Sequence, residues 1–163
     1  MAPDAYGTYF QWKSKYAITT VPYNGKAYGP EETAFAKMAN IPIGDVDPCS
    51  LVEPAGTWRM PSVAECEELF TCPYTAEAKK KGTITLPDGR SLVFAPGGQV
   101  SGSTGKGMLV GSTITFWTID EHATDKTKAR YVTWSTTAAN ATPKVTPGVT
   151  KINGESIRCV KSL

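Results

Sequence analysis

Apolar residues recur at helical spacing in the segment that follows Pro61. They form one stripe along a helix, made of Val63, Cys66, Leu69 and Phe70. Ser62 and Glu65 have the spacing of a capping box, in which each side chain bonds the backbone amide of the other residue. Pro61 disfavours helical backbone in the residue before it. We therefore predict a helix that begins at Ser62 and ends near Phe70.

A second helix is predicted from Pro30 to Met38. Proline suits the first helical position, and the two glutamates that follow it suit the positive end of the helix dipole. The apolar face consists of Ala34, Phe35 and Met38. Asn40 and Pro42 would end this helix.

Strand patterns account for most of the remaining chain. The predicted strands are Gly7–Ser14, Thr83–Leu86, Arg90–Ala95, Thr113–Asp120, Ala129–Ser135 and Glu155–Lys161. Pro87-Asp88-Gly89 is typical of the turn in a β-hairpin and would join the second strand to the third. Two segments lack strand signals: Gly97–Gly107, with five glycines, predicts an exposed, mobile loop, and Ala138–Gly154 predicts irregular structure.

Composition limits the class of protein. A chain of 163 residues predicts a single domain spanning 1–163, with its core at about 7–161. Its 40% hydrophobic and 20% charged residues are ordinary for a globular domain. The net charge is only +2, and the triplet Lys79-Lys80-Lys81 is interpreted as a solvated face. We therefore expect no nucleic acid partner.

The sequence also shows no typical signal for membrane insertion or export. No apolar run approaches the roughly 20 residues of a membrane-spanning helix, so we expect no direct membrane insertion. Met-Ala-Pro-Asp at the start has neither the basic head nor the apolar stretch of a secretion signal. We expect a chain that begins in the cytosol, or an exported mature domain with an added methionine.

The four cysteines bear on that choice. Our preferred pairing joins Cys49 to Cys159 and Cys66 to Cys72, with free buried thiols as the alternative. Residues six apart on an intact helix lie roughly 9 Å apart along its axis, whereas a disulfide needs Cα atoms within about 6.8 Å. The second bridge therefore requires the helix to end near Phe70, as Pro73 also indicates. Disulfides of this kind favour an exported protein.

Several motifs occur in the order of a known family. They are D-P-C, W-R-M-P-S with E-x-x-E-L, G-R-S-L-V-F-A-P-G-G, a glycine loop, T-F-W-T and I-R-C-V-K. In this order the chain, from about Gly7 to Lys161, resembles the Fibrobacter-type major paralogous domain. The spacer Leu51–Thr57 is longer than in the family pattern, and the pair Cys66–Cys72 is not part of it.

The resemblance implies a fold and a location. The fold would be α+β and C-type-lectin-like, with two helices packed on small antiparallel sheets, long loops, and the first and last strands close together. The location would be extracellular, on a bacterial cell surface, often within lipoproteins or fimbria-associated proteins. The calcium-binding triplets of C-type lectins are absent, because Ala55 follows Glu53-Pro54 and Ser135 follows Trp134.

Candidate chemistry is sparse. The chain has one histidine and no G-x-S-x-G motif, so it offers no recognisable catalytic triad. Asp120, Glu121, His122 and Asp125 have side chains that bind hard metals or shuttle protons, but a polar hairpin loop is the commoner reason for such a cluster. The glycine loop does not match a P-loop. That motif needs a glycine five residues before Gly105, and this chain has Val100 there. We predict no enzyme activity, no metal and no cofactor.

The predicted function is a non-enzymatic binding or adhesion module. Its contact surface would be the loops Gly97–Gly107 and Glu121–Lys128, beside the strand that contains Trp117. The ligand-binding candidates are Trp117, Asp120, Glu121, His122 and Asp125. The partner would be a glycan or a protein of a host or bacterial surface. The alternative is a structural fimbrial or tip subunit that docks other subunits by strand addition.

Overall fold

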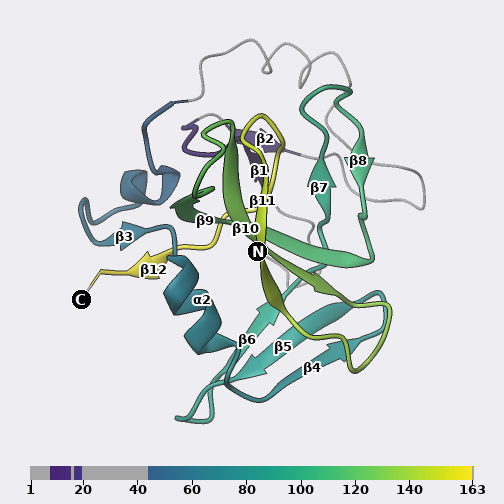
Figure 1. The fold of residues 1–163 in the computed structure, drawn as a ribbon. Coiled ribbons are helices and arrows are strands. Elements are labelled where there is room, and N and C mark those ends of the chain that lie inside the picture. The colour runs from purple at the N-terminus through teal and green to yellow at the C-terminus, as the bar shows by residue number, and fades with distance from the viewer. Residues whose placement is uncertain (1–7, 16, 20–43, 163) are drawn as a thin grey trace.

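The computed structural model describes residues 8–15, 17–19 and 44–162, and its fold is drawn in Figure 1. This part of the chain contains one α-helix, α2 (Val63–Leu69), and one 3-10 helix, η1 (Pro48–Leu51). The strands are β1 (Thr8–Phe10), β2 (Ala17–Thr19), β3 (Trp58–Arg59), β4 (Tyr74–Glu77), β5 (Lys81–Thr85), β6 (Ser91–Phe94), β7 (Gln99–Val100), β8 (Gly107–Met108), β9 (Thr113–Glu121), β10 (Lys128–Ser135), β11 (Lys144–Thr150) and β12 (Val160–Lys161).

The predicted fold class is wrong in its balance of helix and strand. Strands make up 40% of the described residues and helices 9%, with a single α-helix. The second predicted helix, Pro30–Met38, lies outside the described residues. Several short segments without a clear alternating pattern became strands because they pair with another segment, in most cases the next strand along the chain. The described part is therefore mostly β, built from small antiparallel sheets.

Five small sheets make up the β structure (Figure 1). The three-stranded sheet β11-β10-β9 contains the longest strands, and a second three-stranded sheet has the order β4-β5-β6. Pairs β1-β2, β12-β3 and β7-β8 complete the set. The predicted hairpin is confirmed as β5 and β6, with the Gly89 amide donating to the Leu86 carbonyl over 2.9 Å.

The helix α2 begins where its capping box predicts. The Ser62 hydroxyl accepts from the Glu65 amide at 3.2 Å, and the Glu65 carboxylate accepts from the Ser62 amide at 2.8 Å. Arg59 holds the same carboxylate through two nitrogens, at 2.6 and 2.7 Å. Asp47 accepts from the Cys49 and Met60 amides, each within 3.0 Å, and so ties η1 to the start of this segment.

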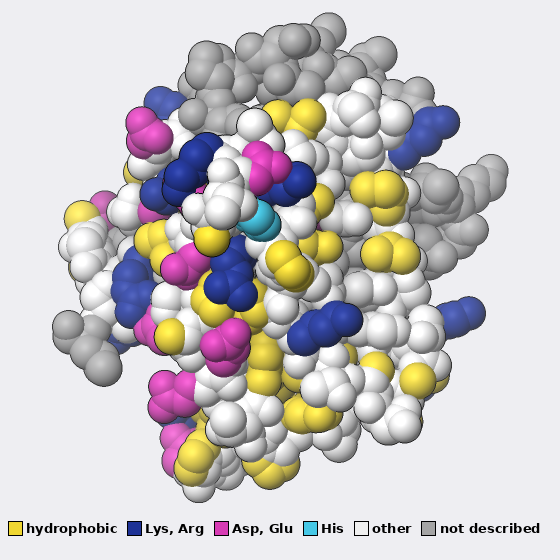
Figure 2. All heavy atoms as spheres, viewed as in Figure 1, with side chains coloured by type: hydrophobic (Ala, Val, Ile, Leu, Met, Phe, Trp, Pro, Cys, Tyr) yellow, Lys and Arg dark blue, Asp and Glu magenta, His cyan; other side chains and the backbone are white. Residues whose placement is uncertain are grey.

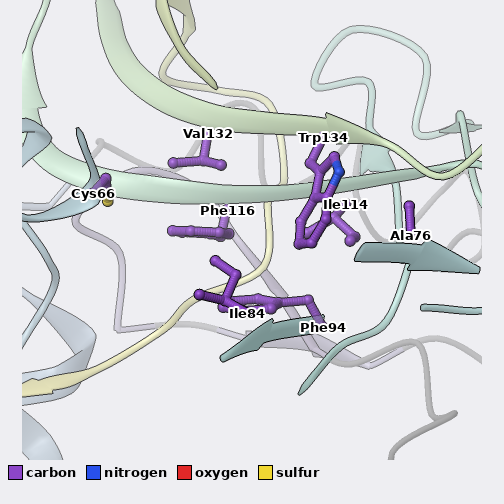
Figure 3. Packing of buried hydrophobic residues seen from close by; sticks show 8 residues of the cluster. All are labelled: Cys66, Ala76, Ile84, Phe94, Ile114, Phe116, Val132 and Trp134. Atoms are coloured by element: carbon purple, nitrogen blue, oxygen red, sulfur yellow. The ribbon is translucent and has the colours of Figure 1, made fainter. Parts of the chain in front are cut away.

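One hydrophobic cluster lies between the two three-stranded sheets and α2 (Figure 3). Its buried members are Cys66, Ala76, Ile84, Phe94, Ile114, Phe116, Val132 and Trp134. Gly82 on β5 lies against the Trp134 ring, and a Cβ there would overlap ring atoms and come within 2.7 Å of Ile114. The glycine therefore allows the β4-β5-β6 sheet to approach the β11-β10-β9 sheet, called the central sheet below, closely.

A second buried cluster anchors the N-terminal strand to the central sheet. It contains Trp12, Cys49, Met60, Trp117 and Ala129. The Trp12 indole donates to the Thr118 carbonyl at 2.9 Å, and the Trp117 indole donates to the Phe10 carbonyl at 2.7 Å. Buried tryptophans are thus both packed and hydrogen-bonded, as the polar edge of an indole requires.

The ends of the described chain meet as the sequence predicted. Phe10 and Glu155 exchange backbone hydrogen bonds of 2.9 and 3.0 Å. The predicted Cys49–Cys159 disulfide is present, with Cα atoms 5.5 Å apart. It links η1 to the strand β12, which pairs with β3.

The predicted Cys66–Cys72 disulfide is absent, and both cysteines are free. After α2 the chain keeps winding, because the Phe70, Thr71 and Cys72 amides donate back to carbonyls three or four residues earlier. Helical winding holds residues six apart at roughly 9 Å or more along the axis, which is beyond the reach of a disulfide. The alternative of free thiols is therefore the one observed.

Two loop predictions and one strand prediction are also corrected. Residues 138–154 are not wholly irregular, because Lys144–Thr150 form β11 against β10. The predicted closing strand is reduced to Val160–Lys161, with isolated bridges at Glu155 and Ser156. Gly97–Gly107 contains β7 and part of β8, and several of its residues are buried.

None of the helices in the described part is long and apolar enough to cross a bilayer.

Candidate functional site

The structure places two of the predicted ligand-binding residues in structural roles. Trp117, predicted to contact a ligand, is fully buried with no exposed surface. The Asp120 carboxylate accepts from the Val63 amide at 2.7 Å and thereby caps the start of α2. Asp120 thus joins the central sheet to the helix.

The remaining predicted residues lie together on the β9–β10 turn and bond one another. Glu121 pairs with Lys126 and with Lys151. The His122 Nδ1 accepts from the Asp125 amide at 3.0 Å. Asp125 pairs with Lys128 at 2.8 Å, and this contact lowers the pKa of its carboxyl. The cluster is therefore largely satisfied within itself.

A polar hollow of about 460 Å³ adjoins this turn. Its lining includes Trp12, Asp45, Glu121, Lys126 and Lys151. The Trp12 ring is only 3% exposed, and the Lys151 ammonium lies 4.3 Å from its centroid. A sugar ring therefore has no free aromatic face to stack on here. Figure 2 shows acidic and basic side chains intermixed on this side of the molecule.

The glycine loop is held more firmly than predicted. Val100 is fully buried, and its backbone exchanges hydrogen bonds of 2.8 Å with Gly154. The Gly102 amide donates to the Asn153 side chain at 3.0 Å. Gly98 has a positive φ of 64° and lies so close to the backbone of residues 108–110 that no side chain fits. Only Ser103, Thr104 and Lys106 of this segment are exposed.

An apolar groove of about 250 Å³ opens between α2, β6 and the segment before β12. The helix contributes Cys66 and Leu69, and β6 contributes Leu92, Val93 and Phe94. Phe116, Pro61, Glu65 and Arg158 to Val160 complete the lining. Leu92 and Val93 are each 38% exposed, which is unusual for two neighbouring apolar side chains on one strand.

Arg158 is the uncompensated charge of this groove. Its guanidinium lies 5.0 Å from the Phe94 ring centroid, and none of the ion pairs among the described residues includes it. Glu65 also lines the groove, but Arg59 neutralises it and lowers the pKa of its carboxyl to about 2. The groove therefore combines apolar walls with one cation that lacks an acidic partner.

The free thiol in this groove is not set up for chemistry. Burial, together with the smaller effect of the neighbouring Glu65 and Asp120 carboxylates, raises the pKa of Cys66 to about 12. A thiol in this state is protonated and poorly nucleophilic at neutral pH. Cys66 therefore serves as part of the apolar wall of the groove.

Glu155 is a buried carboxylate without a stabilising partner. It is fully buried, and neither carboxylate oxygen accepts a hydrogen bond from the residues that the structure describes. The nearby Thr115 hydroxyl donates to the Gly98 carbonyl instead. Burial raises the pKa of Glu155 well above its ordinary value of 4.5. The burial of Glu155 was not expected from the sequence, where it stands only as the first residue of a predicted strand.

Replacing Glu155 with glutamine should change how stability depends on pH. In the native state Glu155 keeps its proton above pH 4.5, whereas the unfolded chain releases it there. The native state then binds more protons, so stability falls as pH rises from 4.5 through the native pKa. Glu155→Gln should remove this loss and be more stable than the original chain at pH 8. Urea unfolding between pH 4 and pH 8 measures the difference.

Measuring the original chain and Glu155→Gln side by side isolates the contribution of Glu155 to the pH dependence of stability. Carboxylates with lowered pKa, such as Glu65, give the opposite slope in both chains, so subtracting the two curves isolates Glu155. Parallel curves for the two chains would show that Glu155 is ionised, or accessible to solvent, in the native protein.

The groove was missed by reasoning from sequence, although one signal was present. Leu92 and Val93 are adjacent in a strand, and adjacent strand residues point to opposite faces. One of them therefore had to point away from the core. Nothing comparable identified Arg158, because its position beside Phe94 depends on a contact between distant segments.

No metal centre is formed in the part of the chain that the structure describes, where no three histidine, cysteine, aspartate or glutamate side chains are grouped to hold an ion. Comparisons of this chain with models of known families, with characterised proteins and with solved structures found no match.

Proposed function

We propose that this protein is a non-enzymatic binding or adhesion module, and that its contact surface is the apolar groove between α2 and β6. The observation that carries the proposal is the unpaired guanidinium of Arg158 beside exposed Leu92 and Val93. Apolar walls with one or a few charged groups are typical of ligand sites. The preferred ligand is apolar and carries a carboxylate.

A protein partner fits this groove better than a glycan. Sugars are bound by exposed aromatic rings and by arrays of polar groups, but Trp12, Trp117 and Trp134 are all buried. The hydrogen-bonding side chains of the β9–β10 turn bond one another. Among the partners expected from the sequence, a surface protein of a host or of another bacterium is therefore favoured.

The proposed location is extracellular, on a bacterial cell surface. The Cys49–Cys159 disulfide supports it, because disulfides form and persist in oxidising compartments. The resemblance to the Fibrobacter-type major paralogous domain points the same way. A structural fimbrial or tip subunit is the second candidate, and the free edge of β6 favours it.

Decanoate is a simple probe of the groove, because it has an apolar chain and one carboxylate. We expect it to shift the backbone amide resonances of Leu92 and Val93 in a nitrogen-15 NMR titration. Arg158→Ala should weaken decanoate binding roughly tenfold or more, since hydrogen bonds to charged groups contribute about 1.5 to 3 kcal/mol. Decyltrimethylammonium, with the opposite charge, should bind poorly to the original chain.

Arg130→Ala is the matched control, because Arg130 lies on β10 and does not line the groove. It should leave decanoate binding unchanged. Equal binding of decanoate and decyltrimethylammonium, or shifts confined to another surface, would contradict the proposed site.

A further inference from the structure

The strand β6 is an edge strand with one unpaired side. Its sheet has the order β4-β5-β6, and β6 pairs only with β5 among the described strands. Along its outer side, the backbone amides and carbonyls of β6 are not paired with any described strand. Natural edge strands are usually protected by charge, proline or a bulge. Here the edge carries Leu92 and Val93, both exposed.

The free edge and the groove belong to one surface. Leu92, Val93 and Phe94 of β6 line the groove directly, and Arg158 lies over the Phe94 ring at its margin. Three binding elements thus meet here: a row of backbone hydrogen-bonding groups, an apolar depression and one unpaired cation. An acyl chain would use only the second and third, whereas an extended peptide uses all three.

We propose that β6 accepts an extended segment of a partner protein as an added strand. Alternate side chains of the segment are apolar and enter the groove, and an acidic side chain of the segment pairs with Arg158. The proposal rests on the proposed function, and it specifies the partner for that same groove. The four residues of β6 extend about 13 Å at 3.3 Å per residue, so about four residues of the segment pair with the edge, and a heptapeptide is long enough to cover it.

The charge of the groove determines which charge the partner segment should carry. Glu65 is bonded by Arg59 on both carboxylate oxygens, so it neither repels an acidic segment strongly nor attracts a basic one. Arg158 remains the available partner for a carboxylate. An arginine stacked on an aromatic ring keeps its hydrogen-bonding edge free for such a pair.

A heptapeptide library displayed on phage tests the proposal with the whole chain as bait. We expect selected peptides to alternate apolar and polar residues and to contain one aspartate or glutamate. The tightest peptide, made synthetically, should slow amide exchange in β6. It should bind Arg158→Ala at least tenfold more weakly than the original chain and should bind Arg130→Ala normally.

Methylating single amides of that peptide reports strand pairing directly. In an added strand only every second amide faces β6, so methylation should abolish binding at alternate positions and be tolerated at the others. Uniform tolerance of methylation, or selected peptides without alternation or acid, would overturn strand addition. If decanoate still binds in an Arg158-dependent manner, that failure leaves the proposed function standing; if decanoate also fails, both are wrong.

Discussion

Replacing Cys49 and Cys159 together with alanine should lower the free energy of unfolding by about 4 to 5 kcal/mol. The disulfide closes a loop with a sequence separation of 110, and cross-linking so long a loop strongly restricts the unfolded chain. The same bridge fastens the segment that contains Arg158 to η1, so the double variant should also bind the groove probe more weakly. Urea unfolding of both proteins measures the loss of stability.

The free cysteines supply the control. Cys72→Ala removes a thiol that is only partly buried and makes no disulfide, so it should cost far less. Thiol titration of the denatured, unreduced protein should find two reactive groups, Cys66 and Cys72. Four reactive thiols in protein made under oxidising conditions would contradict the bridge.

Trp134→Ala should destabilise the protein by about 3 to 5 kcal/mol, the usual cost of removing a large buried aromatic side chain. Trp134 is 2% exposed and packs edge-on against Tyr74 and Phe94, with ring centroids 5.9 and 6.2 Å away. Its indole donates to the Ala141 carbonyl at 2.8 Å. The side chain therefore joins the β4-β5-β6 sheet to the central sheet, and denaturant unfolding measures its contribution.

Trp134→Phe separates packing from hydrogen bonding. It keeps an aromatic ring against Phe94 but loses the donor to Ala141, so its cost should lie between that of the alanine variant and zero. Thr137→Ala, at an exposed position just after β10, serves as the surface control and should change stability little. A Trp134→Ala chain as stable as the original would mean that the two sheets do not depend on this contact.

Local elements were predictable from sequence because their causes lie within a few residues. The capping box of Ser62 and Glu65 sets the start of α2, and the turn at residues 87–89 joins β5 to β6. The fold class was predicted poorly. Strands such as β4 and β11 are stabilised by pairing with the neighbouring strands β5 and β10, and their own residues do not show a clear alternating pattern.

The strand β11 illustrates this limit. It contains Pro147 and Gly148, which normally argue against a strand. It forms because it is the edge strand of its sheet, where a proline need not donate, and because its pairing with β10 is irregular around Arg130. Neither condition can be recognised before the partner strand is known.

The sequence by itself determined the capped helix, the hairpin, the Cys49–Cys159 bridge and the meeting of the chain's two ends. The helix and the hairpin follow from local spacing, and the other two were expected from the positions of the cysteines and of the first and last predicted strands. Only the tertiary structure decided that Trp117 is buried, that Cys66 and Cys72 stay free, and that the buried Glu155 carboxyl accepts no hydrogen bond from the described residues. It also created the groove, because residues 61–69, 92–94 and 158–160 meet only when the chain is folded. Burial and charge pairing are properties of that assembled surface, and neighbours in sequence do not specify them.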